Sequence, residues 1–196
     1  IIAVTSTAPA EGKSTLAANL AAYFARQGTQ VHLIDFDLKN PELSRIFANR
    51  HINAALPDDQ AAGGRDGMQP GKERPRNFDF SGQSAQAKAS DMIEFVSPNT
   101  IATYLEGSRA NYDVVILDVG SLSESSDARM CAELADYVVL AVKWGMTSVE
   151  QFERSLARGL KKSGRSVGAV LTMVPRSEDI ERPAADDQNT RRLALA

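Results

Sequence analysis

A lysine-containing stretch near the start of the chain has the residue types needed to hold a phosphate group. Residues 7–14 read Thr-Ala-Pro-Ala-Glu-Gly-Lys-Ser, which follows the phosphate-loop pattern G-x-x-x-x-G-K-[ST] except that Thr7 replaces the first glycine. In such a loop the glycine lets backbone amides approach the phosphate, the lysine reaches the β- and γ-phosphates, and the serine binds Mg²⁺. The expected nucleotide-binding residues are Pro9, Ala10, Glu11, Gly12, Lys13, Ser14 and Thr15.

Three aspartates stand at the ends of two later apolar segments. Asp35 and Asp37 close one segment, and Asp118 closes another. Because ligands bind at the carboxyl ends of parallel strands, we expect all three to converge on one phosphate and metal site. Alternation along a strand places Asp35 and Asp37 on the same side, and either one could accept the proton of an attacking hydroxyl. The expected metal ligands are Ser14, Asp35 and Asp118, and the expected catalytic residues are Lys13, Asp35, Asp37 and Asp118.

Each of these features also has a simpler interpretation. A Gly-Lys-Ser sequence can occur by chance in a strand-to-helix turn, Asp37 could cap a following helix, and many buried strands end in Asp. The functional interpretation therefore depends on the three motifs occurring together.

The positions of these motifs follow from the elements expected around them. Apolar runs of strand length alternate with helical patterns, which is typical of a parallel sheet covered by helices. The expected strands are Ile1–Thr5, Val31–Asp35, Met92–Ser97, Val114–Asp118, Tyr137–Lys143 and Val167–Val174. We therefore expect an α/β fold of the P-loop NTPase type, with a mostly parallel central sheet flanked by helices on both faces.

Two helices are indicated by the spacing of apolar residues. Leu16, Leu20 and Phe24 recur at helical spacing directly after the loop. Thr147 and Glu150 form a capping box at the start of the second helix. The apolar stripe of that helix consists of Val149, Phe152, Leu156 and Leu160. We interpret both stripes as surfaces that pack on the core.

The chain is divided here into one domain, residues 1–175, and a polar C-terminal tail, residues 176–196. Within the domain, residues 56–90 are rich in Gly, Pro, Gln and charged residues and show no sustained period. Such a segment buries too little apolar surface to offset its ordering entropy, so we expect a flexible loop or insertion.

Composition restricts the class of protein further. The 196 residues suit one α/β domain, and the formal net charge of −3 argues against a dedicated nucleic-acid surface. The single cysteine, Cys131, excludes an internal disulfide, and we interpret it as a packing residue. No apolar run approaches the ~20 residues that span a bilayer. Because the sequence begins without Met in an apolar run, we expect it to be an excised domain.

Four segments carry a resemblance to a known family. They read STAPAEGKSTLAANLA, HLIDFDLKNPELSRIF, YDVVILDVG and DARMCAELADYVVLAVKWGMTS. Together they resemble the bacterial tyrosine kinases, the cytoplasmic ATPase domains attached to chain-length regulators of exopolysaccharide and capsule export. The resemblance runs from Ile1 to about Val174 and weakens between residues 56 and 90.

This resemblance implies a function, a set of cofactors and a location. It implies ATP and Mg²⁺, with phosphoryl transfer to tyrosine or ATP hydrolysis in exopolysaccharide biosynthesis and export. Lys13 and Ser14 would bind phosphate and Mg²⁺, Asp35 and Asp37 would be the additional metal and catalytic carboxylates, and Asp118 would be the Walker B acid. The implied partner is a membrane-embedded polysaccharide chain-length or export component, with a homo-oligomer as a further option. The implied location is the cytoplasm, at the inner face of the bacterial cell membrane.

The sequence also departs from that family. Asp118 is followed by Val-Gly-Ser instead of Thr-Pro-Pro, and Thr172 stands where relatives carry a base-reading Asn. The family phosphorylates tyrosines in its own tail, but residues 176–196 contain none. The tyrosines of the chain are Tyr23, Tyr104, Tyr112 and Tyr137.

These departures leave two alternatives open. One is a nucleotide-dependent assembly switch without protein kinase activity, like the partition and division-site ATPases, although Ala8 occupies the position of their signature lysine. The other is a degenerate pseudo-kinase.

Overall fold

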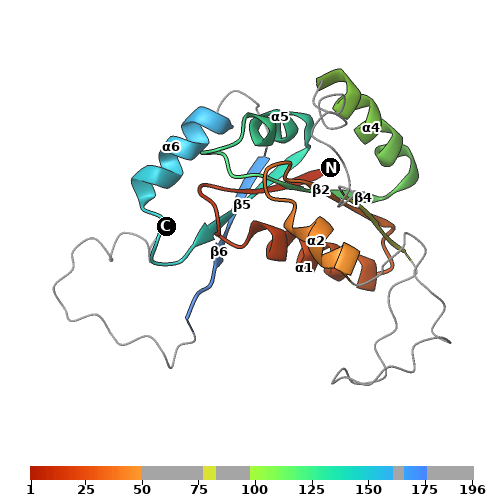
Figure 1. Cartoon of the computed structure of the whole chain (residues 1–196), viewed down its shortest axis with the longest axis horizontal. Coiled ribbons are helices and arrows are strands. Elements are labelled where there is room, and N and C mark those ends of the chain that lie inside the picture. Colours follow the sequence, from red (N-terminus) through yellow and green to blue (C-terminus); the bar gives the residue numbers. More distant parts are fainter. Residues whose placement is uncertain (50–76, 83–97, 161–165, 176–196) are drawn as a thin grey trace.

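The computed structural model describes residues 1–49, 77–82, 98–160 and 166–175 (Figure 1). In chain order the elements are β1 (Ile2–Ser6), α1 (Lys13–Arg26), β2 (Val31–Phe36), α2 (Glu42–Asn49), β3 (Phe78–Ser81), α4 (Pro98–Asn111), β4 (Val114–Val119), α5 (Ser126–Leu134), β5 (Tyr137–Lys143), α6 (Val149–Gly159) and β6 (Ser166–Thr172). Strands and helices alternate along most of this order, which is the pattern that the sequence predicted.

The six strands form one sheet in the order β3-β2-β4-β1-β5-β6, and every neighbouring pair is parallel. This confirms the predicted α/β class, with a fully parallel sheet where a mostly parallel one was expected. Five expected strands lie within two residues of their predicted limits. The expected strand Met92–Ser97 lies outside the described residues. The strands that end at the three predicted motifs, β1, β4 and β2, are neighbours in the sheet.

Strand β3 was not predicted, because it lies within the segment 56–90 that we interpreted as a flexible loop. It pairs with β2 along the edge of the sheet, and Phe78 and Phe80 stack on Phe47 of α2 with ring centroids 6.2 and 4.2 Å apart. Asn77, just before the strand, donates a side-chain hydrogen bond of 3.1 Å to the carbonyl of Ala25. The strand is therefore stabilised by contacts with distant parts of the chain, which local composition does not reveal. The other described residues of that segment are 77 and 82.

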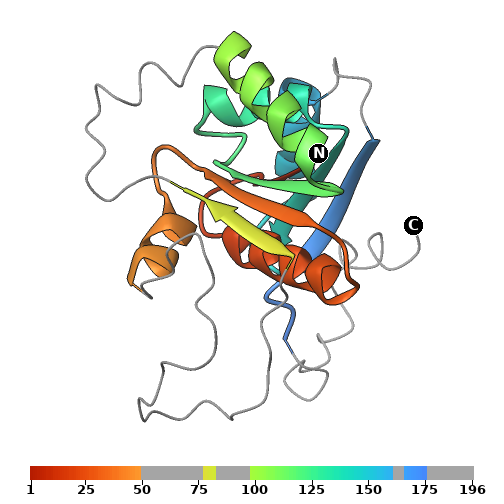
Figure 2. The ribbon, with the colours of Figure 1, turned by 90° about the vertical axis from the view of Figure 1, so that its right-hand side faces the viewer.

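Helices cover both faces of the sheet, as predicted. Helices α1 and α2 lie on one face, and α4, α5 and α6 lie on the other (Figures 1 and 2). Alternation along the strands divides their side chains between the two faces. In β2, for example, Val31 and Leu33 face α1, whereas Ile34 and Phe36 belong to the cluster on the α4 and α5 face. By the same alternation, Asp35 continues the row that faces α1.

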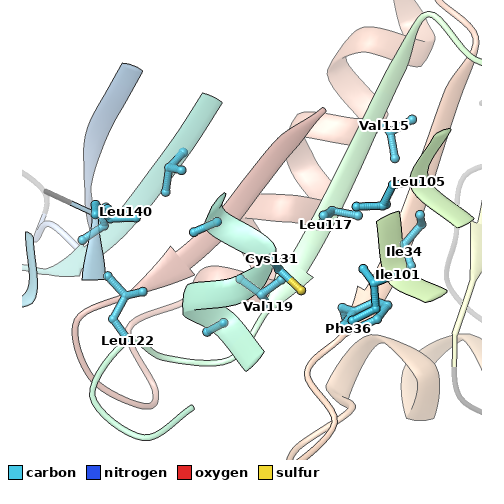
Figure 3. Packing of buried hydrophobic residues seen from close by; sticks show 14 of the residues in the cluster. Ile34, Phe36, Ile101, Leu105, Val115, Leu117, Val119, Leu122, Cys131 and Leu140 are labelled. Carbon is cyan, nitrogen blue, oxygen red and sulfur yellow. The ribbon is translucent and has the colours of Figure 1, made fainter. Parts of the chain in front are cut away.

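The core on the α4 and α5 face is built from aliphatic side chains around the thiol of Cys131 (Figure 3). Cys131 is fully buried in α5, and burial raises the pKa of its thiol to about 12. A buried thiol with so high a pKa behaves as a small apolar residue. This environment agrees with its interpretation as a packing residue.

Helix α1 packs on the sheet through small residues. Ala17, Ala21 and Ala25 are buried against the strands, whereas the predicted stripe of Leu16, Leu20 and Phe24 is only half-buried along the flank of the contact. The stripe does pack on the core, as expected, but alanines form its centre. Small side chains there bring the helix axis close to the sheet, which places the start of α1 beside the strand ends.

The second predicted helix, α6, begins one residue later than the capping box we expected. Ser148 and Gln151 form the box, with Ser148 Oγ accepting the Gln151 N–H at 3.2 Å and Gln151 Oε1 accepting the Ser148 N–H at 3.0 Å. The prediction of Thr147 and Glu150 was therefore wrong by one position. Val149 of the expected stripe is 48% exposed, and the hydroxyl of Thr147 is used elsewhere.

Candidate functional site

The loop between β1 and α1 has a backbone suited to an anion. Gly12, the N-cap of α1, has a φ of 84°, and Ala10 has a φ of 60°. Both values lie in the left-handed region, which glycine adopts without strain and which turns successive amides toward one side. In helix geometry the N–H groups of Lys13, Ser14 and Thr15 have no intrahelical acceptor, and no acidic residue lies in the first turn of α1. A phosphate is the natural ligand of such a helix start.

The missing first glycine of the loop is explained by a buried contact. Thr7 Oγ1 donates to Glu11 Oε2 at 2.7 Å, and the Ala8 N–H donates to the same oxygen at 2.8 Å. Thr147 Oγ1 donates to Glu11 Oε1. Glu11 is only 2% exposed, so its carboxylate connects the phosphate loop to the loop that precedes α6. Glu11 stays one of the predicted nucleotide-binding residues, and its side chain is engaged within the protein.

Thr172 holds the same loop from the end of β6. Its hydroxyl donates to the carbonyl of Glu11 at 2.6 Å and lies 3.3 Å from the carbonyl of Val142. The sequence marked Thr172 only as a departure at a base-reading position. Nothing in the local pattern indicates its contact with Glu11, because the two residues are far apart in the chain.

Strand register brings two of the predicted carboxylates together. Asp35 of β2 and Asp118 of β4 are direct partners in the parallel pairing, and Val4 of β1 pairs with Asp118 on the other side. Partners in register share a face of the sheet, and here that face is the one covered by α1. Asp35 and Asp118 therefore lie on the same side as the start of that helix.

Lys13 is the centre of the resulting cluster. Its Nζ lies 2.6 Å from Asp37 Oδ2 and 3.5 Å from Asp118 Oδ1, and it donates to Ser14 Oγ at 3.1 Å. Burial lowers the pKa of this amine, but the neighbouring carboxylates outweigh burial and the pKa ends above its usual value. Lys13 is thus a charged ammonium group held among acceptors at the phosphate loop.

Asp118 lies in an unusual environment for a carboxylate. It is fully buried, and its partners among the described residues are the Lys13 ammonium group, 3.5 Å from Oδ1, and the neighbouring hydroxyl of Ser14. Burial raises its pKa to about 7, and the charge of Lys13 and the Ser14 hydroxyl offset this only in part. A buried carboxylate with so few partners has a strong affinity for a cation.

This environment fits Mg²⁺ bound together with a phosphate. Within the described residues, no cluster of three or more His, Cys, Asp or Glu side chains is arranged to hold a metal by itself. Mg²⁺ does not need such a cluster, because it is commonly bound through one or two protein ligands, water and the phosphates of its substrate. Ser14 in the first turn of α1 and Asp118 near the end of β4, both buried, would provide that kind of partial ligand set.

Asp35 is engaged by other donors. The N–H and Oγ of Ser44 both donate to Asp35 Oδ2 at 2.7 Å, and the N–H of Asp37 donates to Oδ1 at 3.2 Å. Burial is the main influence on Asp35 and raises its pKa, although these hydrogen bonds oppose the shift. Sequence reasoning missed Ser44: it lies in the segment HLIDFDLKNPELSRIF, but nothing in that segment indicates that its hydroxyl contacts Asp35.

Gly120 allows the loop after β4 to approach Asp37. A Cβ at this position would lie 3.1 Å from Ser125 Cβ and 3.4 Å from Asp37 Oδ1. Thr5 Oγ1 donates to the Gly120 carbonyl at 2.7 Å, which fixes the loop to β1. The residues after Asp118, which differ from those of the tyrosine kinases, thus lie in close contact with Asp37.

The remaining expected residues lie at the surface of the loop. Pro9, Ala10 and Thr15 are exposed, so any contact of theirs with a nucleotide would come from the solvent side. The expected set is therefore divided between a buried cluster around Lys13 and a peripheral set.

Comparisons with known proteins agree with this geometry. The family described as the CobQ/CobB/MinD/ParA nucleotide binding domain (CbiA) matches residues 2–193. The chain belongs to this family. As a member of the CobQ/CobB/MinD/ParA family, it is a P-loop nucleotide-binding domain, and the expected fold class is confirmed.

Relatives within this family include bacterial tyrosine-protein kinases. The chain is 29% identical to tyrosine-protein kinase YwqD of Bacillus subtilis (strain 168) over 171 residues, which cover 87% of the chain and 70% of that protein. It is 30% identical over 150 residues to the succinoglycan biosynthesis transport protein ExoP of Rhizobium meliloti (strain 1021), covering 75% of the chain but only 19% of ExoP. The predicted resemblance to the bacterial tyrosine kinases is confirmed by these matches.

Solved structures show the same fold. The VpsO kinase domain superposes with a TM-score of 0.68 at 24% identity, covering 89% of this chain and 84% of that one. The kinase domain of the Escherichia coli tyrosine kinase ETK has a TM-score of 0.66 at 20% identity, covering 93% and 71%. Within the described residues, none of the helices combines the length and apolarity needed to cross a membrane.

Proposed function

We propose that this domain binds ATP with Mg²⁺ and transfers the γ-phosphoryl group to a tyrosine hydroxyl, in the synthesis and export of an extracellular polysaccharide. The observation that carries the proposal is the cluster in which Lys13 at the phosphate loop contacts Asp37, directly after β2, and Asp118 in β4. Membership in a nucleotide-binding family supports the ATP site. The tyrosine-kinase relatives support the acceptor, and ExoP supports the polysaccharide system.

Each residue of the cluster would have its own role in phosphoryl transfer. The amides at the start of α1 and the ammonium group of Lys13 would bind and orient the phosphates, which is the main contribution of a protein to this reaction. Ser14 and Asp118 would hold Mg²⁺, with Asp35 beside Asp118 as the third expected ligand. Bound Mg²⁺ would supply neutralisation of the phosphate charge.

Of the two candidate bases, Asp37 is better placed than Asp35. Both oxygens of Asp35 accept hydrogen bonds from protein donors, Ser44 and the backbone of Asp37. Asp37 Oδ1 accepts the N–H of Asn40, but its Oδ2 is paired with Lys13, and Lys13 can exchange that contact for phosphate. Asp37 would then accept the proton of the attacking hydroxyl.

We further propose that the acceptor is none of the four tyrosines in this sequence. Tyr104 and Tyr112 lie near His32, with ring centroids 6.3 and 4.6 Å from its ring, and the hydroxyl of Tyr112 donates to Asp79 at 2.7 Å. Tyr23 and Tyr137 are more than half exposed. Tyr137 is the first residue of β5 and so lies at the amino ends of the strands, opposite to the phosphate loop. A membrane-embedded chain-length or export component at the inner face of the cell membrane is the partner that the ExoP match supports.

The alternative is a nucleotide-dependent assembly switch that does not phosphorylate protein. The observation in its favour is the Val-Gly-Ser sequence after Asp118, which differs from the Thr-Pro-Pro expected from the resemblance to the tyrosine kinases. It requires the same nucleotide site, so ATP binding does not separate the two functions.

One incubation separates them. The purified chain is incubated with γ-labelled ATP, Mg²⁺ and a synthetic Glu-Tyr copolymer, and both labelled tyrosine and released phosphate are measured. Label on tyrosine supports the kinase, whereas phosphate release without label supports the switch. If the chain shows neither product and binds no ATP, the proposed function is wrong. Lys13→Met is the control for the site, and Arg26→Met at the far end of α1 is the matched control for loss of a basic residue.

A further inference from the structure

The end of β2 is held to the start of α2 by one buried serine. Ser44 donates twice to Asp35 Oδ2, through its N–H and through its Oγ, each at 2.7 Å. Ser44 is 5% exposed and Asp35 is 3% exposed. A carboxylate that accepts an N–H at the start of a helix is ordinary capping. The hydroxyl is a second donor to the same oxygen, and it fixes the rotation of the carboxylate.

The other oxygen of Asp35 connects this contact to Asp37. The N–H of Asp37 donates to Asp35 Oδ1 at 3.2 Å. Asp37 Oδ1 in turn accepts the N–H of Asn40 at 3.0 Å, and its Oδ2 lies 2.6 Å from Lys13 Nζ. The turn that carries Asp37 is therefore held on one side by Asp35.

We propose that Ser44 is a positioning residue for phosphoryl transfer: its hydroxyl orients the Asp35 carboxylate and thereby fixes the turn that presents Asp37 to Lys13. This inference rests on the proposed function, in which Asp37 acts on the substrate. In this proposal Ser44 acts through Asp35 and not on the substrate.

The end of the edge strand β3 encloses the same hydroxyl. A Cβ built at Gly82 would lie 2.5 Å from Ser44 Oγ and 2.6 Å from Phe80 Cζ. A side chain at position 82 would therefore press on both the hydroxyl of Ser44 and the ring of Phe80. Gly82 thus provides a second way to disturb the hydroxyl, with Ser44 itself unchanged.

The test compares steady-state ATP turnover of the wild-type chain with that of Ser44→Ala and Gly82→Ala. We expect Ser44→Ala to lower kcat by about 10- to 100-fold and to change KM for ATP by less than about 2-fold, because misplacing a reacting group by about 1 Å can cost about 100-fold. Gly82→Ala should lower kcat in the same direction by a smaller factor. Ser44→Thr keeps the hydroxyl and should restore most of kcat. Ser108→Ala, which removes a buried serine hydroxyl from α4, should behave as wild type.

A double variant distinguishes positioning from a general structural role. If Ser44 acts through Asp35, Ser44→Ala should cause no further loss of kcat in the Asp35→Asn background. An additive loss in the double variant, or a wild-type kcat in Ser44→Ala, would overturn the inference while leaving the proposed function intact. A wild-type chain without nucleotide binding or turnover would overturn the proposed function, and this inference with it. Thermal melting of each variant verifies that the compared proteins are folded.

Discussion

Charged side chains lie at both ends of the parallel strands, but in different environments. At the carboxyl ends of β1, β2 and β4, which we call the buried end, the side chains of Lys13, Asp37 and Asp118 are at most 9% exposed. At the amino ends of the strands, which we call the exposed end, Arg109 and Asp136 form an ion pair of 3.1 Å with side chains 44% and 33% exposed. The first group has lost its hydration, and the second has kept part of it.

This difference separates function from stability. Exposed ion pairs contribute little to folding, typically about 0–1 kcal/mol. Buried charges carry a desolvation cost that their mutual attraction often fails to repay. Stability alone therefore gives no reason to bury three charged side chains at one strand end, whereas a site for phosphate and Mg²⁺ does.

The largest expected effect comes from removing the central cation. We expect Lys13→Met to weaken ATP binding in the presence of Mg²⁺ by more than about 100-fold, because the variant loses the phosphate-binding charge and leaves two buried carboxylates without it. Isothermal titration calorimetry measures this directly. An affinity within a few-fold of wild type would show that the buried end of the strands is not the nucleotide site.

A second large effect is expected from Asp118→Asn, with turnover reduced by about 100-fold or more if this carboxylate holds Mg²⁺. The same variant should also change the pH dependence of stability. Since the pKa of Asp118 is raised from 3.8 to about 7, the folded state keeps a proton that the unfolded state releases between these values. The free energy of unfolding should therefore fall as pH rises through this window.

Urea unfolding at several pH values between 4 and 8 measures that slope. Asp118→Asn should flatten it, whereas Asp113→Asn, at the other end of β4, should retain it. Asp113 is a suitable control because it accepts the N–H of Gln30 away from the cluster. Equal slopes in wild type and Asp118→Asn would contradict the raised pKa.

A smaller effect is expected where the phosphate loop is held from β6. Thr172→Val keeps the shape of the side chain and removes the hydrogen bond to Glu11, so we expect the free energy of unfolding to fall by ~1–2 kcal/mol. KM for ATP should rise several-fold because the loop is less restrained. Thr103→Val, which removes an exposed hydroxyl bond to Asn99 within α4, is the control. Equal effects of the two variants on KM would show that the Thr172 contact does not restrain the loop.

The smallest effect is expected at the exposed end of the strands. Arg109→Ala should change the free energy of unfolding by less than ~1 kcal/mol, with a difference that decreases at high salt. ATP binding should be unaffected. A loss of ATP affinity in this variant would mean that the two ends of the strands are coupled. It would contradict the separation between a functional end and a merely charged end.

Much of the fold was predictable because its signals are local. Continuous apolar runs marked β1, β2, β4, β5 and β6, and the glycine and lysine of the phosphate loop marked the start of α1. The edge strand β3 was not predictable in this way, since Phe78 and Phe80 owe their stability to pairing with β2 and stacking on Phe47. The apolar stripe predicted for α1 located the buried face of this helix only approximately. Alanines form the centre of that face because the helix lies close to the sheet, and this distance is not visible in the sequence.

The candidate site was predictable in its charged residues but not in their supports. Lys13, Asp35, Asp37 and Asp118 stand in recognisable motifs. The sequence analysis gave Thr147, Thr172 and Ser44 no role as supports of the site. Each of them contacts a residue that is distant in the sequence or in another element. Polar contacts of this kind have no period or spacing that a sequence can display.

The sequence by itself determined which residues carry charge at the ends of apolar strands and that a phosphate loop opens the first helix. Only the tertiary structure decided that β4 inserts between β1 and β2 and that Asp35 and Asp118 are in register beside Lys13. The reason is that the propensities forming a strand act over a few residues. The partner and register of that strand instead depend on side-chain packing between segments that lie far apart in the chain.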